Sequence, residues 1–292
     1  MNGCKLCPRQ CNTDRSRYKG FCKSGNKIKL ARASLHFWEE PCISGQNGSG
    51  TVFFSGCNLK CVFCQNYMIS HENFGEVITV NRLAEIFLEL QAKNAHNINL
   101  VSGTHFIPQI IEALDLIKER LGIPIIWNTS GYETIESLEL LKDYINIFLT
   151  DLKYKSSELS AKFSAAENYF EYASSAVKDM ISRTGKPQYD HDIMTKGTII
   201  RHLVLPNSRR DSLEILDWLA ENFSPDDFVL SLMSQFTPVY KCSDYPEINR
   251  RVSTFEYNCV TKKAAELGFK GYIQKKTSAA SKFTPTFDLT GI

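Results

Sequence analysis

Apolar runs alternate with amphipathic segments along most of the chain. The runs span residues 51–55, 98–102, 123–127, 146–150, 197–205 and 228–233. They are apolar at nearly every position rather than at every second one, which is typical of strands covered on both faces. Repeated strand–helix units predict an α/β fold with a parallel sheet and right-handed crossovers. Six such units make a partial or full barrel.

The segments between these runs carry apolar residues at helical spacing. Clear stripes fall within residues 83–90, 107–117, 138–141 and 213–219. A further helix is predicted around residues 169–180, before the break at 184–187. A last helix over 254–267 ends at Gly268, a suitable C-cap, and a short strand over 271–274 follows.

Both ends of the chain lack this alternation of apolar runs and amphipathic segments. Residues 1–50 carry five cysteines and end in a glycine-rich stretch, so we expect a small Cys-rich metal lobe followed by a loop. Residues 51–275 form the expected barrel. Residues 276–292 are rich in Ser, Thr and Lys and are predicted to be a C-terminal tail.

Composition and charge narrow the classes of partner. The 292 residues are 43% hydrophobic, as expected for a globular protein with a full core. The net charge is only +2 and there is no polybasic run, so neither nucleic acid nor a membrane surface is expected as a partner. The start of the sequence has no apolar signal region, and no stretch approaches the ~20 apolar residues of a membrane span. We therefore expect a cytoplasmic protein.

The strongest chemical signal is a group of three cysteines directly after the first apolar run. Cys57, Cys61 and Cys64 have the spacing C-x3-C-x2-C. In the reducing cytosol, clustered cysteines are more often metal ligands than disulfides, and thiolates suit iron–sulfur clusters and zinc. Three thiolates can hold three irons of a four-iron cube and leave the fourth open to an external chelator. The alternative is half of a four-thiolate zinc site, but such sites usually come as two C-x2-C pairs.

A second cysteine group lies near the start of the chain. Its members are Cys4, Cys7, Cys11 and Cys22, with Pro8 and Gly20 at positions suited to tight turns. Four thiolates can close a structural zinc site or hold a second cluster, and the sequence does not separate these readings from four free thiols. The nearby arginines Arg9, Arg15 and Arg17 are predicted to lie on a solvated face.

The segment from Gly56 to Asn66 resembles the signature of the radical S-adenosylmethionine (SAM) superfamily, including the aromatic Phe63 just before the third cysteine. More narrowly, residues 50–275 resemble the enzymes related to the pyruvate formate-lyase activating enzyme. The leader from Glu39 to Gly45 resembles a less characterised branch of this group. The resemblance implies a partial (β/α)6 radical SAM barrel.

The resemblance also implies an activity. The cofactors would be a 4Fe-4S cluster on Cys57, Cys61 and Cys64, and SAM bound at the open iron. One-electron reduction, by a flavodoxin or ferredoxin type of partner, would yield methionine and a 5′-deoxyadenosyl radical that removes a hydrogen atom from a substrate. The expected substrate is a glycine α-carbon of a glycyl radical enzyme. The alternatives are a small molecule, a peptide or an RNA base, or a non-catalytic protein held together by zinc.

Residues at the ends of the second and third strands are expected to contact SAM. Gly103 and Thr104 stand where the superfamily often has Gly-Gly-Glu, so the contact to the SAM amino group has lost its usual carboxylate. The neighbouring His105 is either a substitute or a loop histidine. Asn128 and Ser130 lie in a segment that resembles the Asp-Thr-Asn-Gly motif of activating enzymes. Asn128 stands in place of the aspartate, so it keeps an acceptor oxygen but lacks the negative charge. A plain turn is the alternative for this segment.

The fourth and fifth strands supply charged candidates. Asp151 and Lys153 match the Asp-Leu-Lys motif of the activating-enzyme group. Because side chains alternate along a strand, both point to the same face of the sheet. If Leu149 and Leu152 face the helices, that face is the barrel interior. Arg201 resembles an arginine that points into the barrel, where its guanidinium suits a carboxylate. The alternative for the Asp–Lys pair is a structural ion pair at the rim.

Overall fold

A computed structural model describes residues 3–274 and 285–292. Its strands form one curved sheet with the order β10-β9-β8-β6-β5-β4-β2-β1-β3, and the hairpin strand β7 pairs with β8. The strands are β1 (Lys29–His36), β2 (Ser49–Phe54), β3 (Glu76–Val77), β4 (Ile98–Val101), β5 (Ile125–Thr129), β6 (Ile147–Asp151), β7 (Gln188–Asp190), β8 (Ile193–Leu203), β9 (Val229–Met233) and β10 (Gly271–Ile273).

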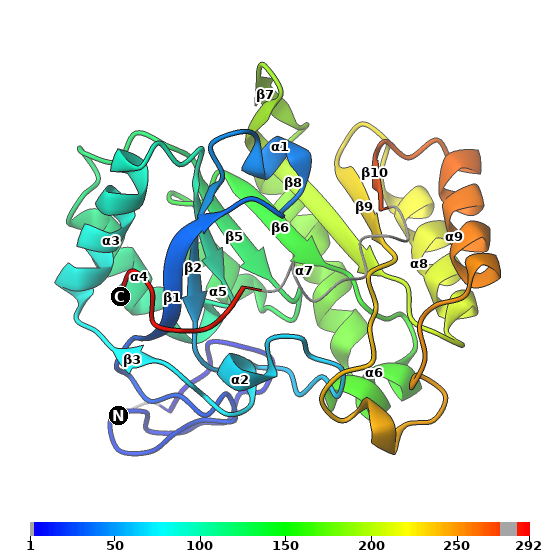
Figure 1. Ribbon diagram of the computed structural model, residues 1–292, viewed down its shortest axis with the longest axis horizontal. Coiled ribbons are helices and arrows are strands. Elements are labelled where there is room, and N and C mark those ends of the chain that lie inside the picture. Colours follow the sequence, from blue (N-terminus) through cyan, green and yellow to red (C-terminus); the bar gives the residue numbers. More distant parts are fainter. Residues whose placement is uncertain (1–2, 275–284) are drawn as a thin grey trace.

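Helices cover the outside of this sheet (Figure 1). Those beside the first half are α3 (Val80–Ala92), α4 (Ile107–Asp115) and α5 (Ile135–Leu140). Those beside the second half are α6 (Ser157–Ser164), α7 (Tyr169–Thr184), α8 (Arg209–Asn222) and α9 (Thr254–Glu266). Within the described residues, β10 and β3 are the two ends of the sheet and do not pair. The predicted partial barrel is thus confirmed.

The strands β2, β4, β5, β6, β8 and β9 are parallel and carry a core on each face. On the outer face, Leu100, Trp127 and Phe148 pack with the apolar sides of α3 and α4. Because these strands are apolar at nearly every position, they supply side chains to the core on each face of the sheet. On the inner face, a second core contains Ile126, Ile147, Leu149, Met194, Ile199 and Val229.

A short helix from the leader closes the amino end of this inner core. In α1 (Pro41–Ser44), Pro41 occupies the first helical position, and Cys42 and Ile43 pack with the inner residues of β5, β6 and β8. Cys42 and Ile43 are 2% and 0% exposed. Cys42 thus serves as a small buried apolar residue, and its helix packs against the amino end of the inner core.

The structure differs from the sequence prediction at both chain ends. Residues 29–36 lie in the segment expected to be a lobe and a loop, yet they form β1, which pairs antiparallel with β2. Part of the expected tail also packs on this strand. Backbone hydrogen bonds join Ala33 N to Thr290 O at 2.9 Å and Leu289 N to Ala31 O at 3.1 Å, and Phe287 is 7% exposed. The tail residues up to 284 lie outside the described residues.

No helix in residues 3–274 or 285–292 is long and apolar enough to cross a membrane.

Candidate functional site

The three-cysteine loop begins at the carboxyl end of β2, where a glycine permits a sharp turn. Gly56 has φ +95°, and a side-chain carbon there would lie 2.4 Å from Ser24 Oγ and 2.6 Å from the carbonyl oxygen of Cys22. Only glycine fits this conformation without displacing the N-terminal segment. The turn thus fixes the direction in which the loop leaves the strand.

Helix α6 and the residues around it hold the loop in place. The Lys60 and Val62 amides donate to the carbonyl oxygens of Ser164 and Phe163, at 3.1 and 2.9 Å. Leu59, Val62 and Phe63 are buried and join the core beside α7 and α8. A loop anchored by both backbone bonds and apolar side chains presents its cysteines from a rigid frame.

Cys61 is buried and Cys57 and Cys64 are half-buried, and the three thiols lie close enough to affect one another. Burial raises the pKa of Cys57 and Cys61, and it raises that of Cys64 to about 12; the Cys61 sulfur adds to the effect at both neighbours. The Ser164 hydroxyl donates to Cys61 Sγ at 3.0 Å, and the Ser70 hydroxyl lies 3.2 Å from Cys64 Sγ. Such hydrogen bonds fix the orientation of sulfur ligands around a metal centre.

The donor set fits a cluster better than a single ion. In the part of the chain that the structure describes, no three His, Cys, Asp or Glu side chains converge closely enough to hold one metal ion. A tetrahedral zinc needs all its sulfurs within ~2.3 Å of one point. A four-iron cube instead takes each thiolate on a different iron, so its ligands stand further apart. Each of the three thiols on this loop could thus meet a different iron and leave the fourth iron open.

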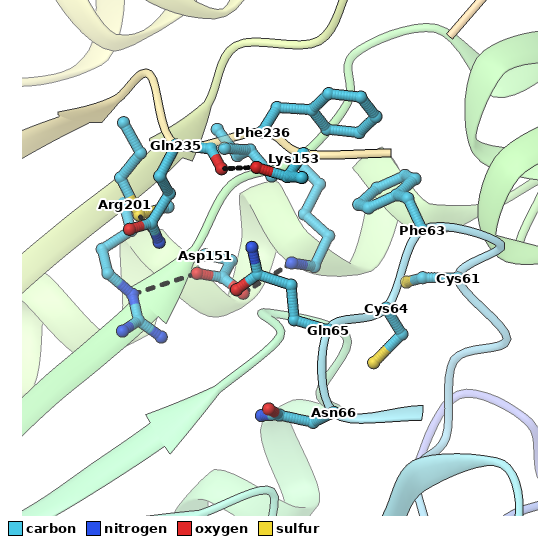
Figure 2. Close-up of a pocket in the computed structure, with 13 residues that line it drawn as sticks. Cys61, Phe63, Cys64, Gln65, Asn66, Asp151, Lys153, Arg201, Gln235 and Phe236 are labelled. Carbon is cyan, nitrogen blue, oxygen red and sulfur yellow. Dashed lines mark hydrogen bonds and ion pairs between the residues drawn. The ribbon is translucent and has the colours of Figure 1, made fainter. Parts of the chain in front are cut away.

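The cysteine loop faces charged residues of β6 and β8 across a cavity of about 200 Å³. Figure 2 shows Cys61, Phe63 and Cys64 on one side, and Asp151 between Arg201 and Lys153 on the other. The remaining lining residues include Gln65, Asn66, Leu203, Met233, Gln235, Phe236 and Thr237. The cavity lies at the carboxyl ends of the parallel strands, where α/β folds bind ligands.

Asp151 connects the two cations of the cavity. Lys153 Nζ lies 2.6 Å from Asp151 Oδ2, and Arg201 Nε lies 3.1 Å from Asp151 Oδ1. Asp151 and Lys153 point into the barrel as predicted, but the accompanying expectation for Leu149 is wrong. Leu149 lies two residues before Asp151, so it shares the inner face, whereas Leu152 faces the helices.

Arg201 also contacts a carboxylate from the leader. Its two terminal nitrogens lie 3.2 Å from Glu39 Oε2 and 2.6 Å from Asn128 Oδ1. Glu39 Oε1 accepts hydrogen bonds from the side-chain amides of Asn99, at 3.1 Å, and Asn128, at 3.4 Å. Arg201 thus bridges Asp151 of β6, Asn128 of β5 and Glu39 of the leader.

Burial and ion pairing act in opposite directions on this network. Burial alone would raise the pKa of Asp151, but Lys153 and Arg201 outweigh it and hold the pKa below the usual value. For Lys153, Asp151 outweighs burial and raises the pKa. For Glu39, burial outweighs the opposing effect of Arg201, so its pKa is raised. The carboxylate nearest the cavity is therefore charged, and the deeper one holds a proton more readily.

Two of the residues predicted at the strand ends bind the protein's own groups. Thr104 donates to Glu133 Oε1 at 2.6 Å, and a side-chain carbon at Gly103 would lie 2.8 Å from Ile110 Cδ1. Ser130 lies 3.4 Å from Asn58 Oδ1, and with Thr104 and Cys57 it lines a small cavity beside the main one. Gly103 packs against α4, so its place in the fold is explained without a ligand.

His105 is a buried loop histidine. Its Nε2 lies 2.8 Å from the Ser55 carbonyl oxygen, and burial lowers its pKa to about 3. The imidazole ring is therefore neutral and held by a backbone hydrogen bond, which indicates a structural role for His105. Gln235 of the segment after β9 lines the main cavity, and its Oε1 accepts a hydrogen bond from Gln274 Nε2 at 3.3 Å.

The N-terminal segment docks directly under the three-cysteine loop. Arg9 Nε donates to the Asn58 carbonyl oxygen at 2.8 Å, and Arg15 donates to the carbonyl oxygen of His105. The prediction that both arginines lie on a solvated face is wrong, because each satisfies a backbone carbonyl of the barrel. Arg17 is exposed, with 72% of its side chain accessible.

The four N-terminal cysteines gather within this segment. The Cys4 and Cys22 sulfurs both add to the raised pKa of Cys7, which burial brings to about 12. The sulfurs of Cys11 and Cys22 lie 3.3 and 3.6 Å from where a side-chain carbon at Gly20 would stand. Here too, no three of the described side chains converge on one ion, so a zinc at this place would require the sulfurs to move closer together.

Sequence reasoning gave no role to several residues of this site. Glu39 was part of a recognised leader, but its contact with Arg201 depends on the path of β1 and α1. Tyr169 donates to the Ser130 carbonyl oxygen at 2.8 Å and accepts from the Lys153 amide at 3.0 Å. Ser70 and Ser164 touch cysteine sulfurs. The one available signal was the Glu39–Glu40 pair, which stands in an otherwise apolar stretch.

Comparisons with known proteins agree with this geometry. The family model "Radical SAM superfamily" matches residues 51–233. "Uncharacterized protein MJ0674" of Methanocaldococcus jannaschii is 33% identical over 280 residues, which cover 92% of this chain and 75% of the relative.

Three solved structures show weaker similarity. SuiB of Streptococcus suis, bound to the precursor peptide SuiA, covers 76% of this chain at 15% identity and TM-score 0.49. SuiB bound to S-adenosylmethionine covers 75% at 14% identity and TM-score 0.49. This chain spans only 48% of either SuiB chain. A domain of a pyruvate-formate lyase-activating enzyme from Bacteroides vulgatus covers 58% of this chain and 93% of its own, at 15% identity and TM-score 0.41.

The family model covers more than half of the chain and spans the parallel strands from β2 to β9 together with the three-cysteine loop. The chain therefore belongs to the radical SAM superfamily, whose cofactors are a 4Fe-4S cluster and SAM.

Proposed function

We propose that Cys57, Cys61 and Cys64 hold the cluster and that SAM occupies the adjoining cavity. When bound, the two cofactors supply a reductive cleavage that yields methionine and a 5′-deoxyadenosyl radical for hydrogen-atom abstraction. The observation that carries this proposal is the placement of two of the three thiols, Cys61 and Cys64, opposite Asp151, Lys153 and Arg201 across one cavity, with Cys57 on the adjoining small cavity.

The chain's own residues have separate tasks in this proposal. Lys153 is a cation that can pair with the SAM carboxylate, while Asp151 can accept hydrogen bonds from ribose hydroxyls. Phe63 lies 5.6 Å from Phe236, centroid to centroid, and this aromatic pair shields the loop side of the cavity from water. Arg201 has all three of its nitrogens on protein acceptors, so we assign it to holding Asp151 in place.

The remaining predicted contacts become secondary candidates. Asn128 is bound to Arg201, and Thr104 and Ser130 lie on the small cavity that also contains Cys57. We propose that these residues meet SAM only at its edge, and that Gly103 contributes through packing. Removing Ser130's hydroxyl should therefore change SAM binding much less than removing Lys153's ammonium.

The proposed substrate is a glycine α-carbon in a glycyl radical enzyme, with a flavodoxin or ferredoxin type of protein as electron donor. Support comes from the match of Asp151-Leu152-Lys153 to the activating-enzyme motif and from a cavity placed at the open end of the barrel. In this reading the partner's glycine-bearing loop enters at the carboxyl ends of the strands.

The test uses protein reconstituted anaerobically with iron and sulfide. With dithionite and SAM, wild type should release 5′-deoxyadenosine, Cys61→Ser should not, and Cys259→Ser should match wild type, because Cys259 lies on α9 away from the cavity. Both variants should keep the thermal stability of apo wild type. Absence of 5′-deoxyadenosine from wild type would reject the proposal.

A second measurement separates the substrate classes. Mixing the active protein with a glycyl radical enzyme should produce a glycine-centred EPR signal that depends on SAM. If 5′-deoxyadenosine forms but no such signal appears with any glycyl radical enzyme, the substrate is a small molecule, a peptide or an RNA base instead.

We also propose that Cys4, Cys7, Cys11 and Cys22 bind a second metal, either zinc or an iron–sulfur cluster. Four cysteines within one docked segment, with Cys7 affected by the sulfurs of Cys4 and Cys22, support this. The iron, sulfide and zinc content of oxygen-free wild type should exceed that of a Cys4→Ala/Cys7→Ala variant by one centre. Equal metal content would contradict a second site.

A further inference from the structure

Positive charge is concentrated in the N-terminal segment, residues 3–27. This segment holds seven of the chain's 34 Lys and Arg side chains but only one of its 32 Asp and Glu side chains. The rest of the chain is therefore net negative, although the whole chain is at +2. A zinc ion or a cluster on the segment's four thiolates would bring negative charge that offsets only part of this excess. Such an asymmetry is typical of a surface that meets an oppositely charged partner.

The seven cations of the segment divide into two groups. Arg9 and Arg15 hold the segment on the barrel, because each donates to a barrel carbonyl oxygen. The other five are exposed: Lys5, Arg17, Lys19, Lys23 and Lys27. The one acid of the segment, Asp14, lies 3.8 Å from Arg17, and the four lysines have no carboxylate within ion-pair distance among the described residues. The exposed cations therefore keep their charge available to a partner.

Two exposed aromatic rings lie among these cations. Tyr18 is 68% exposed and stands between two of the exposed cations in the sequence, and Phe21 is 39% exposed. The guanidinium carbon of Arg9 lies 4.0 Å from the centroid of the Phe21 ring, and Lys60 Nζ lies 5.2 Å from it. Aromatic rings with a polar, charged rim are the composition that protein–protein interfaces favour. A face that only meets water needs no such rings.

This surface lies one contact away from the three-cysteine loop. Lys60 Nζ, beside the Phe21 ring, donates to the Cys57 carbonyl oxygen at 3.3 Å. Cys22 follows Phe21 in the sequence, and its carbonyl oxygen lies 2.6 Å from where a side-chain carbon at Gly56 would stand. A protein bound at Phe21 is thus separated from the backbone of Cys57 by a single side chain.

The surface and the main cavity lie on different sides of this loop. None of the residues 3–27 lines the cavity, to which Cys61 and Cys64 contribute. Figure 1 shows the N-terminal segment, in dark blue, as a layer below α2 (Tyr67–Ser70). A partner bound to this layer leaves the cavity open. The position favours a protein that exchanges electrons with the cluster over one whose loop has to enter the cavity.

We propose that residues 3–27, together with Lys60, form the docking surface for an acidic one-electron carrier protein that reduces the cluster from the Cys57 side. One electron passes from the carrier to the cluster, so the carrier is oxidised, the cluster is reduced, and no bond forms or breaks. Opposite charges speed the encounter and orient the carrier. This inference rests on the proposed function, since it takes the three-cysteine loop to hold the cluster.

The first experiment measures binding without any chemistry. An acidic, oxidised [2Fe-2S] ferredoxin is titrated into the full reconstituted chain by calorimetry under anaerobic conditions. The Kd should rise about tenfold or more between ~0.02 M and ~0.3 M NaCl, because salt screens attraction between exposed charges. Cytochrome c, a basic carrier, should not bind.

Charge reversal locates the surface. Lys19→Glu/Lys23→Glu should weaken ferredoxin binding by about tenfold at low salt. The matched control is Lys93→Glu/Lys118→Glu, which changes the net charge equally at two exposed lysines that follow α3 and α4. It should bind ferredoxin as wild type does. Equal weakening by both double variants would show that the total charge of the chain matters and not this surface.

Release of 5′-deoxyadenosine separates docking from an effect on the cluster. With reduced ferredoxin at concentrations below its Kd, Lys19→Glu/Lys23→Glu should release 5′-deoxyadenosine about tenfold more slowly than wild type. With dithionite, which needs no docking surface, the two rates should be equal. Equal slowing with both reductants would mean that these lysines act on the cluster itself, and the inference would be wrong.

Two further outcomes would overturn the inference without any variant, so they decide the matter even if a variant folds poorly. They are the absence of ferredoxin binding to wild type, and binding that salt does not weaken. A single-stranded RNA oligonucleotide provides the other comparison. If it binds wild type but not Lys19→Glu/Lys23→Glu, while ferredoxin binds both equally, the surface serves nucleic acid instead.

Failure of this inference can be told from failure of the proposed function. Release of 5′-deoxyadenosine with dithionite reports on the cluster and SAM alone. If it is absent, the proposed function fails. If it is present while ferredoxin does not bind, only the docking surface fails.

Discussion

The two ends of the barrel interior are built from the same strands and differ in kind. At the amino end, Ile147 and Leu149 of β6 pack with Ile199 of β8 beneath the leader helix α1. Two residues further along β6 and β8, Asp151 and Arg201 form an ion pair at the edge of the cavity. The apolar layer and the charged layer are thus separated by two residues along each strand, which is one repeat of the side-chain alternation. It shows how one sheet separates stability from chemistry.

The difference also explains the role of the leader. It closes the amino end with Cys42 and Ile43 and, within three residues, sends Glu39 to the charged layer. One short segment thus touches both layers. Four changes probe this division, from the largest expected effect on stability to the smallest.

The charged layer should be most sensitive at Arg201. Arg201→Ala leaves Asp151 and Glu39 buried without their shared cation, so we expect a loss of about 3–5 kcal/mol in the free energy of unfolding, measured in urea. SAM cleavage should be lost as well. The exposed Arg210, which pairs with Glu214 at 3.1 Å, provides the control, and Arg210→Ala should cost no more than ~0.5 kcal/mol. Similar costs for both variants would show that the charged layer is not a unit.

The apolar layer should respond in stability but not in chemistry. Leu149 is fully buried, and Leu149→Ala leaves a cavity under α1, so we expect a loss of about 3 kcal/mol. The folded fraction should still cleave SAM at the wild-type rate. A large drop in the rate at full folding would mean that the two layers are coupled.

A buried carboxyl next to the small cavity should make stability depend on pH. Glu133 accepts bonds from Thr104 and Trp127, its Oε2 has no partner among the described residues, and burial raises its pKa to about 7. A raised folded-state pKa means that the native state binds the proton more tightly, so stability falls as pH rises from about 4.5 to about 7. The loss should be about 3 kcal/mol, because each unit of the pKa difference corresponds to about 1.4 kcal/mol.

Glu133→Gln removes the titrating group and should remove that dependence. We expect the variant to match wild type at pH 5 and to exceed it at pH 8, with both free energies from urea denaturation of the apo protein. If the difference in unfolding free energy between Glu133→Gln and wild type is the same at pH 8 as at pH 5, the pKa of Glu133 is not raised by burial.

A cap far from both layers should have the smallest effect. Ser253 and Glu256 form a capping box at the start of α9. Ser253→Ala should cost about 1 kcal/mol and leave SAM cleavage unchanged. Any loss of cleavage from this variant would show that the assay responds to general destabilisation rather than to the charged layer.

The sequence predicted the parallel strands well because each is a continuous apolar run between helical stripes. β1 was missed because Lys29–His36 mixes small, basic and polar residues, and its partner β2 lies beyond the leader. Its pairing with residues near the end of the chain also depends on contacts over long sequence distances.

The candidate site was predictable only where local motifs carry it. Alternation placed Asp151 and Lys153 together, and spacing identified the cysteines. Their partners were not predictable in the same way: Glu39 reaches Arg201 across 162 residues, and Thr104 reaches Glu133 through the packing of neighbouring strands. Gly103 and Thr104 were assigned to SAM by position, and the structure gives both of them protein neighbours.

The proposed chemistry requires a cluster on Cys57, Cys61 and Cys64 with one iron open to SAM. The direct measurement is the EPR spectrum of the anaerobically reconstituted, reduced protein, recorded without SAM and then with SAM labelled with 15N at its amino group. We expect a cluster signal that shifts when SAM is added and gains coupling to the 15N nucleus, and that is lost in Cys61→Ser. A protein that contains zinc and no iron, or a cluster signal that SAM leaves unchanged, would contradict this expectation.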